Sequence, residues 1–284
     1  MRDFVIMCDV NADVDPAFAK AEGVAILPQY YHFNDGVIYG DEEVLDIHDF
    51  FARLVKERAY SMGCNPERVG GIMEEAVKAG HDVLALMASS ECSGSYNTVR
   101  LAAEEIMEEH PEAKIMVVDT LLECTPINLL VRYALELKKA GKTLEETAAA
   151  VEEKKSQMDV YFLVDQLDYL VRGGRLSSFS GAVGTMLNIK PILHFENGRI
   201  VAFMKCRGRN AGKKAMMDSL KKKNLDKTLV SVAHTVALEE AKAFAAQLEA
   251  ELGVTVVSID EVNPTIGTHT GPNAIGVAFC ELPE

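Results

Sequence analysis

The chain has 284 residues, of which 48% are hydrophobic and 25% charged, and its 29 basic and 43 acidic residues give a formal net charge of −14 at pH 7. This composition excludes a disordered chain, a coiled coil and a collagen-like repeat, and at roughly 100–200 residues per domain the length predicts two domains. No apolar run approaches the ~20 residues of a membrane helix, and the N-terminus lacks the ~7–15 apolar residues of a signal peptide, so we expect a cytoplasmic protein without membrane insertion. Because so acidic a chain repels phosphate backbones, we expect no nucleic-acid partner.

The first half of the sequence alternates continuous apolar runs with amphipathic patterns. The predicted strands are 4–8, 83–88 and 114–119, and the predicted helices are 46–58, 66–79, 94–110, 126–140 and 144–158. Continuous apolar runs are typical of strands that are covered on both faces. The alternation of strand and helix therefore predicts a doubly wound parallel sheet with right-handed crossovers in a domain of residues 1–158.

The second half has the pattern of a mixed sheet. Two short apolar stretches flank Asn197 and Gly198, and Asn-Gly is a strong hairpin signal. Further strands are predicted at 228–233, 254–259 and 274–280, and a helix with one apolar face lies between the first two. We therefore predict an α+β domain of residues 159–284.

Three polar segments precede predicted helices, at 61–67, 89–94 and 119–126, with Asn65, Ser93 and Thr125 as expected N-caps. In a doubly wound fold, ligands bind at the carboxyl ends of the strands, where helix N-termini direct backbone N–H groups at an anion. The hydroxyl groups of Ser61 and Ser93 could bind a carboxylate there, or they could only cap helices. These residues alone leave both readings open.

Two later segments combine glycines with polar side chains. In 169–177 (YLVRGGRLS) two arginines flank a Gly pair, and 266–274 (IGTHTGPNA) places His269 among hydroxyls and glycines in an expected loop. Such a histidine is either a hydrogen-bonded structural residue or a ligand-binding one. The sequence contains no P-loop, dinucleotide-binding glycine motif or standard zinc-protease motif.

The sequence resembles the DegV family over nearly its whole length. The resemblance is most specific at 169–177 and at 266–272 (IGTHTGP), and it is looser at 89–96 (SSECSGSY) and in the VVDT stretch that ends at Thr120. It implies a DegV-like fold with a ligand cleft between the doubly wound and mixed-sheet domains. It also implies a lipid-binding subunit, rather than an enzyme, that needs no cofactor and presents a fatty acid to a cytosolic fatty-acid kinase.

The family's site residues map onto this sequence by resemblance. The expected ligand-binding residues are Ser61, where the family usually has Thr, together with Ser93, Arg175, Thr268, His269 and Thr270. Arg207 lies where family members dock the kinase. Neutral donors would leave the bound carboxylate ionised, and the tail would gain ~0.8 kcal/mol per buried CH₂ group in an apolar tunnel.

The sequence departs from the family at these same loops. Cys64 replaces a proline, Glu91 and Cys92 replace Gly-Leu, and Glu123 and Cys124 stand among expected small residues. The two glutamates would repel a fatty-acid carboxylate.

Each of the three cysteines directly precedes an expected N-cap, a position that lowers a thiol pKa. Cys64, Cys92 and Cys124 could therefore hold zinc or an iron–sulfur cluster in an enzyme that uses Glu91 or Glu123 as acid or base. They could also form a redox-sensing thiol module, or be small buried residues.

Overall fold

The computed structural model describes residues 2–176 and 189–283, so Ser177, the last residue of the YLVRGGRLS motif, lies outside the described residues. The strands are β1 (Phe4–Asp9), β2 (Ala25–Leu27), β3 (Tyr30–His32), β4 (Ile38–Tyr39), β5 (Tyr60–Met62), β6 (Asp82–Met87), β7 (Ile115–Asp119), β8 (Met158–Leu163), β9 (Ile189–Glu196), β10 (Arg199–Arg207), β11 (Leu225–His234), β12 (Val256–Glu261) and β13 (Ile275–Glu281).

The α-helices are α1 (Pro16–Glu22), α2 (Ile47–Leu54), α3 (Pro66–Lys78), α4 (Ser95–Glu109), α5 (Thr125–Lys139), α6 (Leu144–Lys154), α7 (Asp168–Arg172), α8 (Arg209–Leu220), α9 (Leu238–Leu252) and α10 (Pro264–Thr270). The described residues also form two short 3₁₀ helices, η1 (Val10–Ala12) and η2 (Lys155–Gln157). None of the described helices is both long enough and apolar enough to cross a bilayer.

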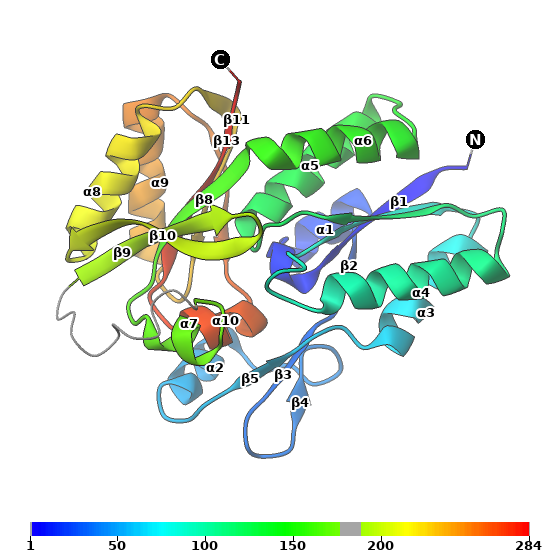
Figure 1. The fold of residues 1–284 in the computed structure, drawn as a ribbon, viewed down its shortest axis with the longest axis horizontal. Coiled ribbons are helices and arrows are strands. Elements are labelled where there is room, and N and C mark those ends of the chain that lie inside the picture. Colours follow the sequence, from blue (N-terminus) through cyan, green and yellow to red (C-terminus); the bar gives the residue numbers. More distant parts are fainter. Residues whose placement is uncertain (1, 177–188, 284) are drawn as a thin grey trace.

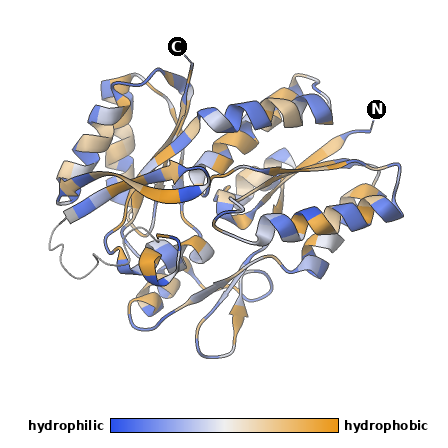
Figure 2. Cartoon of the chain, viewed as in Figure 1, coloured by the Kyte–Doolittle hydropathy of each residue, from blue (hydrophilic) through white to orange (hydrophobic). Residues whose placement is uncertain are grey.

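A parallel sheet with the order β2-β1-β6-β7 forms the first half, as predicted. All residues of β6 are buried, because α3 and α4 pack on one face of the sheet while α5 and α6 pack on the other. Figure 2 shows bands of polar and apolar residues on α4 and α5, as expected for amphipathic helices that cover a sheet. The doubly wound arrangement is thereby confirmed.

A mixed sheet with the order β10-β9-β8-β13-β11-β12 forms the second half, with α8 and α9 packed on its outer face (Figure 1). Its hairpin turns at Asn197 and Gly198, which have φ values of 50° and 78°, as a tight two-residue turn requires. Helix α5 packs against strands of both large sheets, so one core joins the two halves. The first strand of the six-stranded sheet along the chain, β8, begins at Met158. The division into domains at 158/159 stays a prediction.

A small antiparallel sheet, with the order β4-β3-β5, lies below the two large sheets in Figure 1. It packs with α2 and α7 around an aromatic cluster that includes Tyr31, Phe50 and Tyr169. Its strands have only two or three residues each, too few for a recognisable alternation. This sheet pairs Ser61 with Tyr31 and so holds Ser61 on a strand rather than in the expected loop.

Candidate functional site

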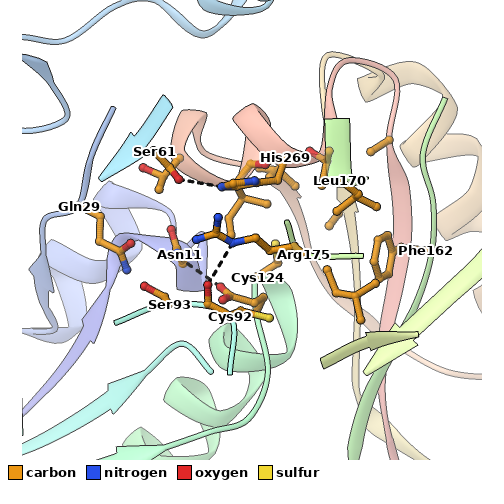
Figure 3. Close-up of a pocket in the computed structure, with 18 of the residues that line it drawn as sticks. Asn11, Gln29, Ser61, Cys92, Ser93, Cys124, Phe162, Leu170, Arg175 and His269 are labelled. Carbon is orange, nitrogen blue, oxygen red and sulfur yellow. Dashed lines mark hydrogen bonds between the residues drawn. The ribbon is translucent and has the colours of Figure 1, made fainter. Parts of the chain in front are cut away.

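A cavity of about 260 Å³ lies between the carboxyl ends of the parallel strands and one face of the six-stranded sheet (Figure 3). Its apolar wall includes Val160, Phe162, Leu170, Phe195, Ile200 and Ile275. Its polar wall includes Asn11, Gln29, Ser61, Ser93, Glu123, Arg175, His234, His269 and Thr270. The cavity therefore combines an apolar surface with a set of polar groups, as small-molecule sites do.

Two predicted ligand-binding residues meet in the polar wall. Ser61 Oγ lies 2.7 Å from His269 Nε2, and Figure 3 shows the two side chains directed toward one another. His269 lies on α10, not in the expected loop, because Pro264 occupies the first helical turn and Asn263 caps it by accepting from the N–H groups of Thr265 and Ile266.

The His269 imidazole is neutral. Burial, followed by the positive charges of Arg175, Arg172 and Arg58, lowers its pKa from 6.5 to about 3. Among the described residues no hydrogen-bond partner reaches its Nδ1 atom. Gly173 packs against that side of the ring so closely that a Cβ there would lie 2.2 Å from Nδ1, and any side chain at this position therefore requires the imidazole to move.

Arg175 links two segments that border the cavity. Its Nε donates to the carbonyl oxygen of Cys92 at 3.1 Å, and its Nη1 donates to that of Gly173 at 2.6 Å. Ser93 lines the cavity beside this link, and its Oγ accepts from Ser95 N at 3.2 Å. The predicted N-cap at Ser93 is wrong by one residue, since α4 is capped at Gly94, which has no side chain to take that role.

Helical periodicity separates the two threonines predicted to bind ligand. Thr270 lines the cavity together with Ile266, four residues earlier on the same face of α10. Thr268 does not line the cavity, because its position turns it to another face, where its hydroxyl donates to the carbonyl of Thr265 at 2.8 Å. The prediction of Thr268 as a ligand residue is therefore corrected.

Arg207 is exposed at the end of β10, outside the cavity. Its assignment to kinase docking stays a prediction.

The three cysteines of the metal alternative do not gather at one point. Cys92 and Cys124 line the cavity, whereas Cys64 is buried in the core between the parallel sheet, α3 and α4. Within residues 2–176 and 189–283, one group of three or more potential ligands has its donor atoms within 4.8 Å of one another, and it consists of Glu74, Glu109 and His110 on the outer helices. The described geometry therefore does not supply the converging sulfur ligands that this alternative requires.

The expectation of lowered thiol pKa values is also wrong. Burial raises the pKa of Cys64 and of Cys92 to about 12, and it raises that of Cys124 well above its usual value. Cys124 is itself the N-cap residue, with φ 62°, so the predicted cap at Thr125 is displaced by one position. Desolvation of the thiolate outweighs the field of the helix N-terminus at these positions.

Two of the departures from the family pattern instead hold the hairpin in place. Glu91 accepts from Arg199 Nε at 2.7 Å, and Cys92 Sγ lies 3.3 Å from the carbonyl oxygen of Gly198. Ser89 Oγ donates to the same carbonyl at 2.7 Å, and a Cβ on Gly198 would lie 2.6 Å from that hydroxyl. The β9–β10 turn therefore packs directly on the loop that carries Ser93.

Sequence reasoning did not assign Asn11 or Gln29 to the site, and it considered Glu123 only as a group that repels a carboxylate or that serves as acid or base beside a metal. Asn11 and Gln29 lie two residues beyond the ends of β1 and β2, and Glu123 lies four residues beyond the end of β7, so all three follow carboxyl ends of parallel strands. Their position after predicted strands was the sequence signal that could have assigned these residues to the site. The signal was weak for Gln29, because β2 has only three residues and is hard to recognise as a strand.

Comparisons with known proteins cover nearly the whole chain. The family model for DegV, described as an uncharacterised protein, matches residues 3–282. A DegV domain-containing protein of Clostridium perfringens is 35% identical over 284 residues, with 98% of each chain covered. A protein of Thermotoga maritima named a fatty acid-binding protein is 31% identical over 282 residues, with 95% of each chain covered. The crystal structure of DegV from Bacillus subtilis, described as a fatty acid binding protein, has a TM-score of 0.87 and 27% identity, covering 99% of this chain and 100% of that one.

Proposed function

The chain belongs to the DegV family, as its motifs predicted, and we propose that it binds a fatty acid in the cavity with the carboxylate at Ser61, Ser93 and His269. The observation that carries the proposal is the neutral Ser61–His269 pair in the polar wall of a largely apolar cavity. Relatives that are named for fatty acid binding support it.

The polar wall offers neutral hydrogen-bond donors, a guanidinium group and a helix N-terminus to a carboxylate. Hydroxyl groups and a neutral imidazole can donate hydrogen bonds without neutralising the anion. The Arg175 guanidinium adds a positive charge at the cavity wall. The N-terminus of α4, a helix of 15 residues, begins beside Ser93, and its dipole favours a negative charge there.

The apolar wall suits an acyl chain. Phe162, Phe195 and Ile200 border the cavity, so methylene groups placed there leave water at a gain of about 0.8 kcal/mol each. In this proposal the protein is a cytoplasmic carrier that binds the fatty acid. A partner protein carries out the chemical reaction on it.

We further propose that the loaded protein presents its carboxylate to a fatty-acid kinase at the β10 edge of the six-stranded sheet. Arg207 is exposed there, and Phe203 and Met204 on the same strand are 43% and 38% exposed. Phosphorylation of the bound fatty acid by such a kinase and ATP should fall at least tenfold in Arg207→Ala. Lys56→Ala, which removes an exposed cation after α2, should leave it unchanged. Equal rates in the two variants would refute this docking surface.

Native mass spectrometry of the purified protein tests fatty-acid binding. We expect an adduct with the mass of a long-chain fatty acid, or uptake of hexadecanoic acid after delipidation. The methyl ester of the same acid, which lacks the carboxylate, should bind more weakly. A protein that carries no fatty acid and takes up none would overturn the proposal.

A further inference from the structure

Glu123 is a buried carboxyl group in the wall of the cavity. The residue is only 7% exposed, and it directly precedes Cys124, the N-cap of α5. Its Oε2 accepts from Asn11 Nδ2 at 3.3 Å, and within the part of the chain that the structure describes this is its only hydrogen bond to another residue. A polar side chain with one weak partner thus faces the cavity that we assign to a fatty acid.

The charged groups around Glu123 show which end of the cavity it faces. Burial and the neighbouring carboxylates Asp9 and Asp13 raise its pKa, and Arg175 opposes them. The same Arg175 guanidinium lowers the pKa of His269, so it lies within electrostatic range of both residues. In Figure 3 the Arg175 side chain lies between His269 on one side and Cys92 and Cys124 on the other. Glu123 therefore borders the end of the cavity that holds Ser61 and His269, which we call the head-group end, rather than its far apolar end.

An unsubstituted acyl chain is a poor neighbour for this carboxyl group. It would remove water from Glu123 and offer no hydrogen bond in return, and an unsatisfied buried polar group lowers affinity. A second carboxylate on the ligand would add an anion beside the buried carboxyl groups of Glu123, Asp9 and Asp13, whose pKa values burial already raises because their charged forms are disfavoured there. A hydroxyl group is both a donor and an acceptor, so it can pair with Glu123 whether that group is ionised or protonated, and it can also accept from Asn11.

We propose that Glu123, with Asn11, is a specificity-determining residue that makes the cavity prefer a fatty acid with a hydroxyl group within a few carbons of its carboxylate. This inference rests on the proposed function, because it assumes that the carboxylate lies at Ser61 and His269. Sites that hydrogen-bond a ligand hydroxyl discriminate strongly against the analogue that lacks it. The departure of this sequence from small residues at position 123 then sets which fatty acid is carried.

Isothermal titration calorimetry on the delipidated full chain tests the preference with three ligands. These are hexadecanoic acid, 3-hydroxyhexadecanoic acid and 16-hydroxyhexadecanoic acid. We expect the 3-hydroxy acid to bind at least tenfold more tightly than hexadecanoic acid, and the 16-hydroxy acid to show no such gain. Glu123→Leu should abolish the preference, while Glu123→Gln, which keeps a donor and an acceptor, should retain most of it. Glu108→Leu makes the same exchange on an exposed residue of α4 and should leave the preference intact.

The possible results distinguish failure of the hydroxyl preference from failure of the proposed fatty-acid binding. If the wild type binds hexadecanoic acid and the 3-hydroxy acid equally, the inference is overturned and the proposed function stands. If the wild type binds none of the three acids, both are overturned. A folded Glu123→Leu variant that keeps the preference also refutes the role of Glu123. Should that variant fail to fold, absence of the preference in the wild type decides against the inference.

Discussion

Ser61 Oγ and His269 Nε2 lie 2.7 Å apart although 208 positions separate the two residues in the chain. Ser61 is held by the small sheet and His269 by α10, and these elements pack with α2 and α7 beside the two large sheets. The head-group site therefore depends on a substructure that adds no strand to either large sheet.

Removal of the Ser61 hydroxyl should weaken fatty-acid binding. Ser61→Ala deletes one hydrogen-bonding group from the head-group site, and we expect about tenfold weaker affinity from the loss of a hydrogen bond to a charged group. Ser61→Thr keeps an Oγ atom at the same position and should bind within about threefold of the wild type, a difference under 1 kcal/mol. Calorimetric titration of the delipidated proteins measures both. Wild-type affinity in Ser61→Ala would exclude the hydroxyl from the site.

A side chain at position 173 should displace His269. Gly173→Ala places a Cβ 2.2 Å from Nδ1, so the imidazole must move away from Ser61, and fatty-acid affinity should fall at least tenfold. Gly71→Ala is the matched control, since no atom lies within 4 Å of its added Cβ on α3, and it should bind normally. Replacing a helical glycine with alanine should also stabilise this control by about 0.5–1 kcal/mol. Normal affinity in a folded Gly173→Ala protein would argue against a fixed imidazole.

The neutral state of His269 predicts a pH dependence of stability. Its pKa is about 3 in the folded protein and about 6.5 when unfolded, so its contribution to stability is present above pH 6.5 and is lost as the pH falls. Between pH 8 and pH 5 the wild type should lose about 2 kcal/mol more unfolding free energy than His269→Gln.

Urea denaturation at several pH values measures this difference. Asp9 and Asp13, whose pKa values burial raises to about 7, act in the opposite direction, but they are present in both proteins and cancel in the comparison. Parallel pH profiles for the two proteins would show that His269 titrates normally.

The three thiols of the metal alternative should be unreactive in the folded protein. Because burial raises their pKa values, Cys64, Cys92 and Cys124 should be alkylated by iodoacetamide at pH 8 at least about tenfold more slowly than in urea, as only the thiolate reacts. One equivalent of zinc should not alter these rates. Fast alkylation that zinc suppresses at all three positions would restore the metal alternative.

Much of the fold could be predicted because its signals are local. The apolar runs of β1, β6 and β7 predict strands of the parallel sheet, and Asn197-Gly198 predicts the hairpin. The strands of the small sheet were missed because two or three residues contain no periodicity. Cap positions at α4 and α5 shifted by one residue, in the second case because Cys124 adopts a positive φ that no propensity foretells.

The site was only partly predictable because burial is a property of the assembled fold. Ser61, Ser93, Arg175 and His269 were assigned by resemblance, and the structure places all four around one cavity. The direction of the thiol pKa shifts depends on the surrounding core, which the sequence does not display. The presence of Glu123 in the cavity wall depends likewise on how β1 and β7 align in the sheet.

A crystal structure of the protein loaded with hexadecanoic acid tests the central claim most directly. We predict a carboxylate oxygen within hydrogen-bonding distance of Ser61 Oγ or His269 Nε2, with the tail along Phe162, Phe195 and Ile200. A ligand with its carboxylate at the apolar end, or one bound outside the cavity, would contradict the account.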